Sequence, residues 1–213
     1  MRLRASLAAV VVLVLVVVVA PEATGGGGTP ITSCGQTLTT SAVLTQNLNC
    51  TGSGVIVGAS GITIDLKGFT LRGDGSGSHH GIDTQMGGFD GLTVKNGAIV
   101  NFNHGIDARG DSDNVSVSQV LISGNDTGIW LEGDFAKIQS VTASGNDYHG
   151  IRIAGDAGLL KANTTNGNGS PGGTSDGGGS GIYVPLFTIP PVGTNNTALG
   201  NDDPAECSPT YLC

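Results

Sequence analysis

A four-residue motif, Gly-Ile followed by any residue and then an apolar one, recurs along most of the chain. Successive copies start 22–31 residues apart, and the first two are looser versions of the pattern. The copies begin at Gly54, Gly81, Gly105, Gly128, Gly150 and Gly181. A unit this short cannot bury its own apolar side, so the units must stack on one another to form a continuous core.

Each unit also contains further short stretches in which apolar and polar residues alternate. Examples are Val115–Val117 and Val120–Ile122, and several units close with a Gly-Asn pair. Alternating runs of three to five residues between Gly, Asn and Asp turns are typical of strands. Because only 4% of the residues are aromatic, the core must consist of many small branched side chains. We therefore predict an all-β chain in which each unit is one coil of three short strands.

The Gly-Ile-x-apolar start and the Gly-Asn turn resemble the parallel β-helix repeats of the pectate-lyase-like superfamily. Cys34-Gly35, Leu48-Asn49-Cys50 and the stretch 61–68 are similar to the N-terminal opening of secreted members. The resemblance covers residues 34–203. It implies a right-handed parallel β-helix of about six coils. It implies no single activity, because the superfamily includes lyases, hydrolases, epimerases and adhesins.

The first residues have the features of a secretory signal. A basic start, Met1–Arg4, precedes an apolar run over residues 5–20. This pattern predicts a signal helix over 1–24, with an uncleaved membrane anchor as the alternative. The remaining boundaries follow from composition: a Gly-rich linker over 25–33, a cap and first coil over 34–60, the β-helix over 61–203 and a disulfide-closed cap over 204–213. We expect a secreted or extracytoplasmic protein, with the cell surface included.

Four cysteines lie near the two ends of the predicted β-helix, in a compartment where disulfides persist. Six coils at about 4.8 Å separate these ends by roughly 25–30 Å. Bridged Cα atoms lie within about 7 Å of each other. We therefore expect one bridge at each end, Cys34–Cys50 and Cys207–Cys213.

The charge balance limits the classes of partner. The chain has 17 acidic and 9 basic residues, for a net charge of −8. Without clustered Lys and Arg, nucleic acid and anionic membrane surfaces are poor partners. We expect a monomer whose partner, if it has one, is a polysaccharide, and a membrane contact only through an uncleaved leader.

Two columns of side chains should run along the outside of the stacked coils. With the motif Ile inward, the third motif residue points outward, about 4.8 Å from its equivalents on the neighbouring coils. This first column is Asp83, Asp107, Trp130, Arg152 and Tyr183. The residues before each Gly form a second column: His80, His104, Thr127, His149 and Ser180.

The first column could act on a glycan. Two neighbouring carboxylates repel, so we expect the pKa of Asp83 or Asp107 to be raised. Trp130 and Tyr183 are the candidate sugar-binding rings, and Arg152 can bind a carboxylate. The catalytic candidates are Asp83, Asp107, Arg152, His104 and His149. The Gly- and Ser-rich insertion over 167–181 could act as a lid. The alternative is a solvated face without a ligand.

We assign no cofactor and no metal. A metal bound by His80 and His104 with Asp83 and Asp107 is a less favoured alternative, because neighbouring coils give no characteristic ligand spacing. Asp111 and Asp113 offer oxygen ligands for Ca²⁺, but we favour a solvated turn at this position.

Two asparagines replace apolar residues of the predicted core. Asn163 and Asn196 align with Val120 and Val141. We therefore expect their side chains to point inward and to bond the turn backbone as an asparagine ladder.

The catalytic motifs of the superfamily are largely missing. A polygalacturonase would show Asn-Thr-Asp, an Asp pair within a coil, Gly-His-Gly and Arg-Ile-Lys. This chain has only His149-Gly150-Ile151-Arg152, and Asp202-Asp203 follows the last coil start. The sequence favours a carbohydrate-binding or surface-structural protein without efficient catalysis. The alternative is a small polysaccharide lyase, hydrolase or epimerase acting through the outward Asp, His and Arg residues.

Overall fold

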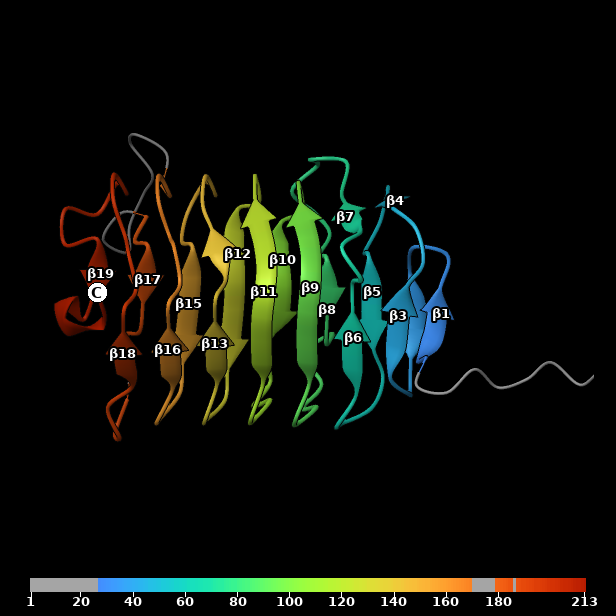
Figure 1. Cartoon of the computed structure of the whole chain (residues 1–213), viewed down its shortest axis with the longest axis horizontal. Helices are drawn as coiled ribbons and strands as arrows, with labels where there is room; N and C mark the ends of the chain where they lie inside the picture. The colour runs from blue at the N-terminus through green and yellow to red at the C-terminus, as the bar shows by residue number, and fades with distance from the viewer. Residues whose placement is uncertain (1–26, 170–178, 186) are drawn as a thin grey trace, which may run out of the picture.

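The chain winds into a parallel β-solenoid, seen side-on in Figure 1 with the N-terminal coils at the right and the C-terminal coils at the left. The computed structural model describes residues 27–169, 179–185 and 187–213. Every strand pairing among them is parallel, so the predicted all-β fold is confirmed. The predicted signal helix over 1–24 lies outside the described residues, as does most of the insertion over 167–181.

Two sheets form the walls of the solenoid. The 8-stranded sheet has the order β19-β17-β15-β12-β10-β8-β5-β2. Its strands are β2 (Gln36–Leu38), β5 (Val55–Val57), β8 (Ile82–Asp83), β10 (His104–Ala108), β12 (Thr127–Glu132), β15 (Ile151–Ala154), β17 (Ile182–Tyr183) and β19 (Cys207–Ser208).

The 11-stranded sheet follows the path β1-β3-β6-β9-β11-β13-β16-β18, with β4, β7 and β14 paired beside it. Its strands are β1 (Thr29–Ile31), β3 (Ala42–Leu44), β4 (Leu48–Asn49), β6 (Thr63–Asp65), β7 (Thr70–Arg72), β9 (Thr93–Val100), β11 (Ser116–Ser123), β13 (Lys137–Gln139), β14 (Thr142–Ala143), β16 (Leu159–Lys161) and β18 (Val192–Thr194). A single 3₁₀ turn in the described residues, Thr210–Leu212, ends the chain. No helix among these residues has the length and apolar character needed to cross a membrane.

The solenoid has about seven turns, rather than the six predicted. The difference arises at the ends of the solenoid, where β2 and β19 extend the 8-stranded sheet without a copy of the motif. β1 also begins at Thr29, within the segment whose composition predicts a linker. β1 pairs with β3 in register, Thr29 opposite Ala42 and Ile31 opposite Leu44. The second and third strands of a coil also merge in places, because β9 and β11 each continue through a corner residue with positive φ, Asn96 and Gln119.

The motif glycines are required because neighbouring coils approach one another closely. A Cβ atom at Gly105 would lie 2.6 Å from the carbonyl oxygen of Gly128, and one at Gly128 would lie 2.4 Å from that of Gly150. The Gly-Asn pairs have a different cause. Their glycines, such as Gly124 at φ 65° and Gly145 at φ 65°, adopt the left-handed conformation that only glycine enters without strain.

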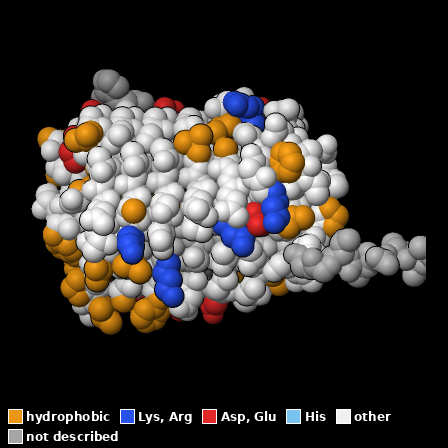
Figure 2. All heavy atoms as spheres, in the orientation of Figure 1, with side chains coloured by type: hydrophobic (Ala, Val, Ile, Leu, Met, Phe, Trp, Pro, Cys, Tyr) orange, Lys and Arg blue, Asp and Glu red, His pale blue; other side chains and the backbone are white. Residues whose placement is uncertain are grey.

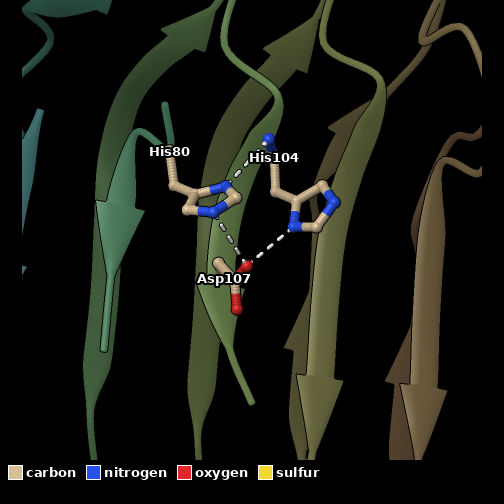
Figure 3. A group of neighbouring side chains, drawn as sticks. All are labelled: His80, His104 and Asp107. Atoms are coloured by element: carbon tan, nitrogen blue, oxygen red, sulfur yellow. Dashed lines mark hydrogen bonds and ion pairs between the residues drawn. The ribbon is translucent and has the colours of Figure 1, made fainter. Parts of the chain in front are cut away.

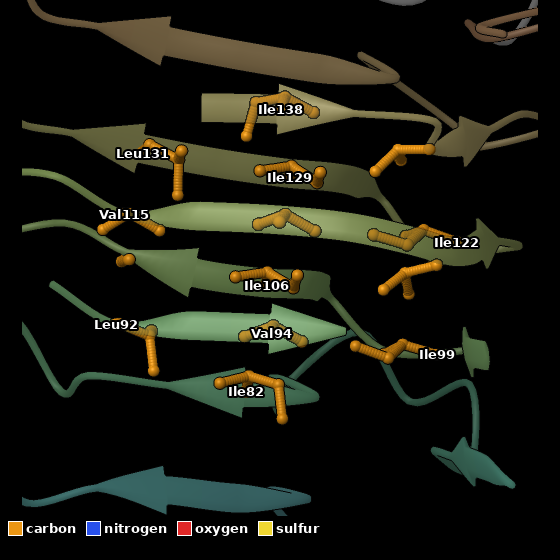
Figure 4. Packing of buried hydrophobic residues seen from close by; sticks show 14 of the residues in the cluster. Ile82, Leu92, Val94, Ile99, Ile106, Val115, Ile122, Ile129, Leu131 and Ile138 are labelled. Atoms are coloured by element: carbon orange, nitrogen blue, oxygen red, sulfur yellow. The ribbon is translucent and has the colours of Figure 1, made fainter. Parts of the chain in front are cut away.

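The motif isoleucines form one side of the core. Ile82, Ile106, Ile129, Ile151 and Ile182 are all 0% exposed. Figure 4 shows Ile82, Ile106 and Ile129 following one another along the 8-stranded sheet, with residues such as Val94 and Ile138 from the opposite sheet. The inward orientation predicted for this column is confirmed.

Buried asparagines form two ladders inside the solenoid. The predicted pair is confirmed, since Asn163 donates from Nδ2 to Asn196 Oδ1 at 3.0 Å and both are buried. A longer ladder uses the asparagines of the Gly-Asn turns, Asn125, Asn146, Asn168 and Asn201, each donating from Nδ2 to Oδ1 of the next. We did not predict this inward role for the turn asparagines.

Both expected disulfides are present, one near each end. Cys34 bonds Cys50 and Cys207 bonds Cys213, with Cα–Cα distances of 5.7 and 6.1 Å. Two such bonds are consistent with an extracytoplasmic protein.

Candidate functional site

The predicted first column exists in the register of the 8-stranded sheet. Asp83 pairs with Asp107, Asp107 with Trp130, Trp130 with Arg152, and Arg152 with Tyr183. These five residues form the outer strip. Its orientation follows from the alternation of a strand, because each strip residue adjoins a buried Ile.

Asp107 is the most heavily bonded residue of the outer strip, and it is only 2% exposed. Its Oδ2 lies 2.7 Å from His104 Nδ1 and 3.4 Å from His80 Nε2, and both rings point toward it in Figure 3. Arg109 binds the same carboxylate in two-point fashion, with Nε 2.9 Å from Oδ1 and Nη2 2.7 Å from Oδ2. The site is therefore an ionic cluster built from two neighbouring coils.

The electrostatics of Asp107 contradict our expectation of a raised pKa. Burial alone would raise the pKa of this carboxyl group, but hydrogen bonds from His104 and Arg109 outweigh it and hold the pKa far below its ordinary value. Burial also lowers the pKa of His80, although the charge of Asp107 opposes this effect. For Asp107 the expectation was wrong because two groups bind its carboxylate, His104 on the same strand and Arg109 directly after β10.

Asp83 lies beside this cluster and has its own partners. It is 8% exposed and accepts hydrogen bonds from the Gln85 backbone N–H at 2.7 Å and from Ser53 Oγ at 3.5 Å. Asp83 and Asp107 are therefore held by separate donors instead of sharing one proton.

Trp130 is contacted by two guanidinium groups from neighbouring coils. Arg109 Cζ lies 4.7 Å and Arg152 Cζ 4.4 Å from the ring centroid, and the His104 ring lies 4.9 Å away. The indole Nε1 donates to Glu132 at 3.2 Å. These contacts leave less of the ring available to a sugar than we expected.

Arg152 lies between two rings and has no carboxylate partner. Its Cζ is 4.4 Å from the Trp130 centroid and 5.4 Å from that of Tyr183. Among the described residues, no acidic side chain forms an ion pair with it, and its buried Nε has no hydrogen-bond partner. Arg109, by contrast, is paired, and the pKa of its guanidinium is raised by hydrogen bonding to Asp107.

The predicted histidines divide between two places. His104 belongs to the Asp107 cluster, whereas the His149 ring stacks on Tyr183 with centroids 4.6 Å apart. His149 Nδ1 accepts the backbone N–H of Ser180 at 3.1 Å. The structure therefore does not bring His104 and His149 together as one pair.

Within the described chain, one group of residues has metal-ligand geometry. The donor atoms of His80, His104 and Asp107 all lie within 4.8 Å of one another, and Asp83 is not part of the group. The pair Asp111 and Asp113 does not form such a group, and Asp113 Oδ1 accepts the backbone N–H of Asp134 at 2.7 Å.

One hollow of the described surface lies among residues other than those of the outer strip. This hollow of about 450 Å³ is lined by residues that follow β12 and β15, including Asp134 and Asp156, together with Phe187. Exposed apolar side chains gather over the C-terminal coils at the lower left of Figure 2, where β16 and β18 carry Leu159 and Val192 in register. The outer strip itself is a surface on which guanidinium groups and aromatic rings contact one another from coil to coil.

Comparison of the chain with protein-family models, with curated proteins and with solved structures finds no match. The structure therefore supports only the fold class, a parallel β-solenoid. Any function must therefore be argued from the geometry above.

Proposed function

We propose that the protein is an extracytoplasmic carbohydrate-binding solenoid without efficient catalysis, and that an acidic glycan binds along the outer strip. The single observation that carries this proposal is the Arg152 guanidinium between Trp130 and Tyr183, which forms no ion pair with an acidic residue of the described chain. Other described cations also lack an ion pair, but the Arg152 guanidinium contacts two rings and its buried Nε has no hydrogen-bond partner among the described residues.

Arg152 suits the carboxylate of an acidic sugar. A guanidinium has several N–H donors in a fixed plane and binds carboxylates through two parallel hydrogen bonds. The Trp130 ring fixes this plane from one neighbouring coil and Tyr183 from the other. A polymer lying along the solenoid axis would meet these two rings on either side of Arg152.

Two features favour binding over catalysis. The pKa of Asp107 is held low, so its carboxyl group is neither a proton donor nor an effective base near neutral pH. The hollow of about 450 Å³ in the described surface is also lined by other residues than those of the outer strip, whereas enzyme sites usually occupy a concave pocket.

The test is a binding panel of uronic acid polymers, sulfated glycans and neutral glucans, measured by calorimetry. We expect uronate binding, and we expect Arg152→Met to weaken it about 10–100-fold, the value of one charge-assisted hydrogen bond. Lys137→Met, on the 11-stranded sheet, is the matched control and should bind normally. Absence of binding to every polymer, or unchanged affinity in both Arg152→Met and Tyr183→Ala, would reject the carbohydrate role and favour a purely structural protein.

A second candidate function rests on the 2.7 Å contact between His104 Nδ1 and Asp107. A carboxylate that accepts from one imidazole nitrogen leaves the other as a general base. His104 could then serve a small lyase, hydrolase or epimerase. Incubation with uronate polymers, with and without Ca²⁺, would reveal unsaturated products or new reducing ends, and His104→Ala would abolish them. Without product in the parent protein, the enzyme hypothesis fails.

A further inference from the structure

We propose that His80, His104 and Asp107 bind a divalent transition-metal ion such as Zn²⁺. The three side chains come from adjacent coils, His80 just before β8 and the other two from β10. Both imidazoles point toward Asp107 Oδ2 (Figure 3). The site shares Asp107 with the outer strip, but the proposal does not rest on glycan binding at Arg152.

The two donor distances to Asp107 Oδ2 are near those of a bound ion, and all three donor atoms lie within 4.8 Å of one another. Zinc holds nitrogen and oxygen donors at about 2.0–2.2 Å, which places tetrahedral ligands about 3.3–3.5 Å apart. The His80 Nε2 to Asp107 Oδ2 distance is 3.4 Å and already fits. The His104 Nδ1 to Oδ2 distance of 2.7 Å must lengthen by roughly 0.6 Å as the ion replaces the proton between them.

The donor chemistry selects the class of metal. Two imidazoles and one carboxylate suit Zn²⁺, Co²⁺ and Ni²⁺, whereas Ca²⁺ and Mg²⁺ prefer oxygen donors throughout. The His80 side chain is 19% exposed, whereas the side chains of His104 and Asp107 are 6% and 2% exposed. The remaining coordination positions can therefore face solvent on the His80 side and accept water.

Two existing contacts oppose the ion and limit its affinity. Arg109 Nη2 occupies Oδ2 at 2.7 Å and must release it, although Arg109 Nε can stay on Oδ1 at 2.9 Å and support the ligand. Coordination through His80 Nε2 also places a proton on Nδ1, which ends the 3.3 Å hydrogen bond from the His104 backbone N–H. We therefore expect an affinity of about 1–10 µM, far weaker than that of a structural zinc site.

The experiment uses the full chain without a histidine tag, stripped with chelator and titrated with Zn²⁺ by calorimetry and with Co²⁺ by visible absorption. We expect one saturable site per chain, tetrahedral Co²⁺ absorption bands and no comparable binding of Ca²⁺ or Mg²⁺. Loss of a residue that only supports a metal ligand weakens metal binding about 10–100-fold. His80→Ala removes a ligand itself, so its effect on Zn²⁺ binding should be larger. His79→Ala, which removes the neighbouring histidine outside the cluster, is the matched control and should bind as the parent does.

Asp107→Asn is informative only if the chain folds, because it leaves Arg109 without its partner. The partly exposed His80 gives a variant that avoids this difficulty. No saturable Zn²⁺ or Co²⁺ binding below 1 mM, or equal binding by the parent and His80→Ala, would overturn the proposal. The trio would then be an ion-pair network that only positions Asp107.

Discussion

Replacing Asn146 with alanine would test whether the asparagine ladder fixes the coils against one another. Asn146 is 1% exposed and lies in the middle of the longer ladder. Its Oδ1 accepts from the Asn125 backbone N–H at 3.2 Å and from Asn125 Nδ2 at 3.0 Å. Its own Nδ2 donates to Asn168 Oδ1 at 2.9 Å.

The expected loss of stability follows from these bonds. Alanine leaves the buried Asn125 N–H without an acceptor, at a cost of about 1–3 kcal/mol. It also removes two amide–amide hydrogen bonds, each worth about 0.5–1.5 kcal/mol. Asn168 Oδ1 still accepts the Asn146 backbone N–H at 3.1 Å, so it adds little. We therefore expect the free energy of unfolding to fall by about 2–6 kcal/mol.

The assay is urea unfolding followed by far-UV circular dichroism and by the fluorescence of the single tryptophan. Gln139→Ala is the matched control, since it removes an exposed amide from β13 and should change stability by less than about 0.5 kcal/mol. If Asn146→Ala were as stable as this control, the ladder would be an incidental contact and the argument from buried amides would be refuted.

Three further predictions concern the scaffold. Gly128→Ala should destabilise the fold by about 1–3 kcal/mol or more, because its Cβ would overlap the next coil, whereas Gly52→Ala has open space and should be tolerated; thermal unfolding of the two variants compares them directly. The double replacement Cys34→Ser and Cys50→Ser opens a bridge between residues 16 apart and should lower the free energy of unfolding by about 3 kcal/mol, and a change near zero would show that the bridge does not restrain the unfolded chain. Burial raises the pKa of Asp65, but backbone and amide hydrogen bonds outweigh it and lower the pKa below 3.8, so its stabilising effect is complete above that pH and is lost as the pH falls through the folded-state value. Asp65→Asn should therefore flatten the acid limb of a stability-versus-pH curve, and an unchanged limb would contradict the assignment.

The repeat predicted the fold because a single geometric requirement recurs in every coil. The motif Ile must be buried and the motif Gly must lie against the next coil, so Ile106 and Gly105 identify a strand and its register. Once the register is known, the neighbours of Asp107 in its column follow without further information. The extra turn was missed because β2 and β19, the end strands of the 8-stranded sheet, carry no copy of the motif.

The contacts of the site were less predictable than its positions. Register places Asp83 beside Asp107, but the rotamer of Arg109 decides which carboxylate is neutralised. The sequence does carry a signal for this, because residues two apart on a strand share a face and Asp107 and Arg109 have opposite charges. The inward turn asparagines had a similar signal, since Asn125 and Asn146 recur at the coil spacing.

Arg152 and Arg109 show how stability and function can be separated on such a regular surface. Arg109 gains a bidentate ion pair with the buried Asp107, so the fold itself accounts for its presence. Arg152 gains ring contacts worth about 0.5–1 kcal/mol each where exposed, but its buried, unpartnered Nε costs about 1–3 kcal/mol. These contributions nearly cancel, so packing alone gives little reason for an arginine at this position. A ligand that supplies an acceptor would remove the cost of the unpartnered Arg152 Nε. We therefore place the glycan contact at Arg152 and not at Arg109, which is already paired with Asp107.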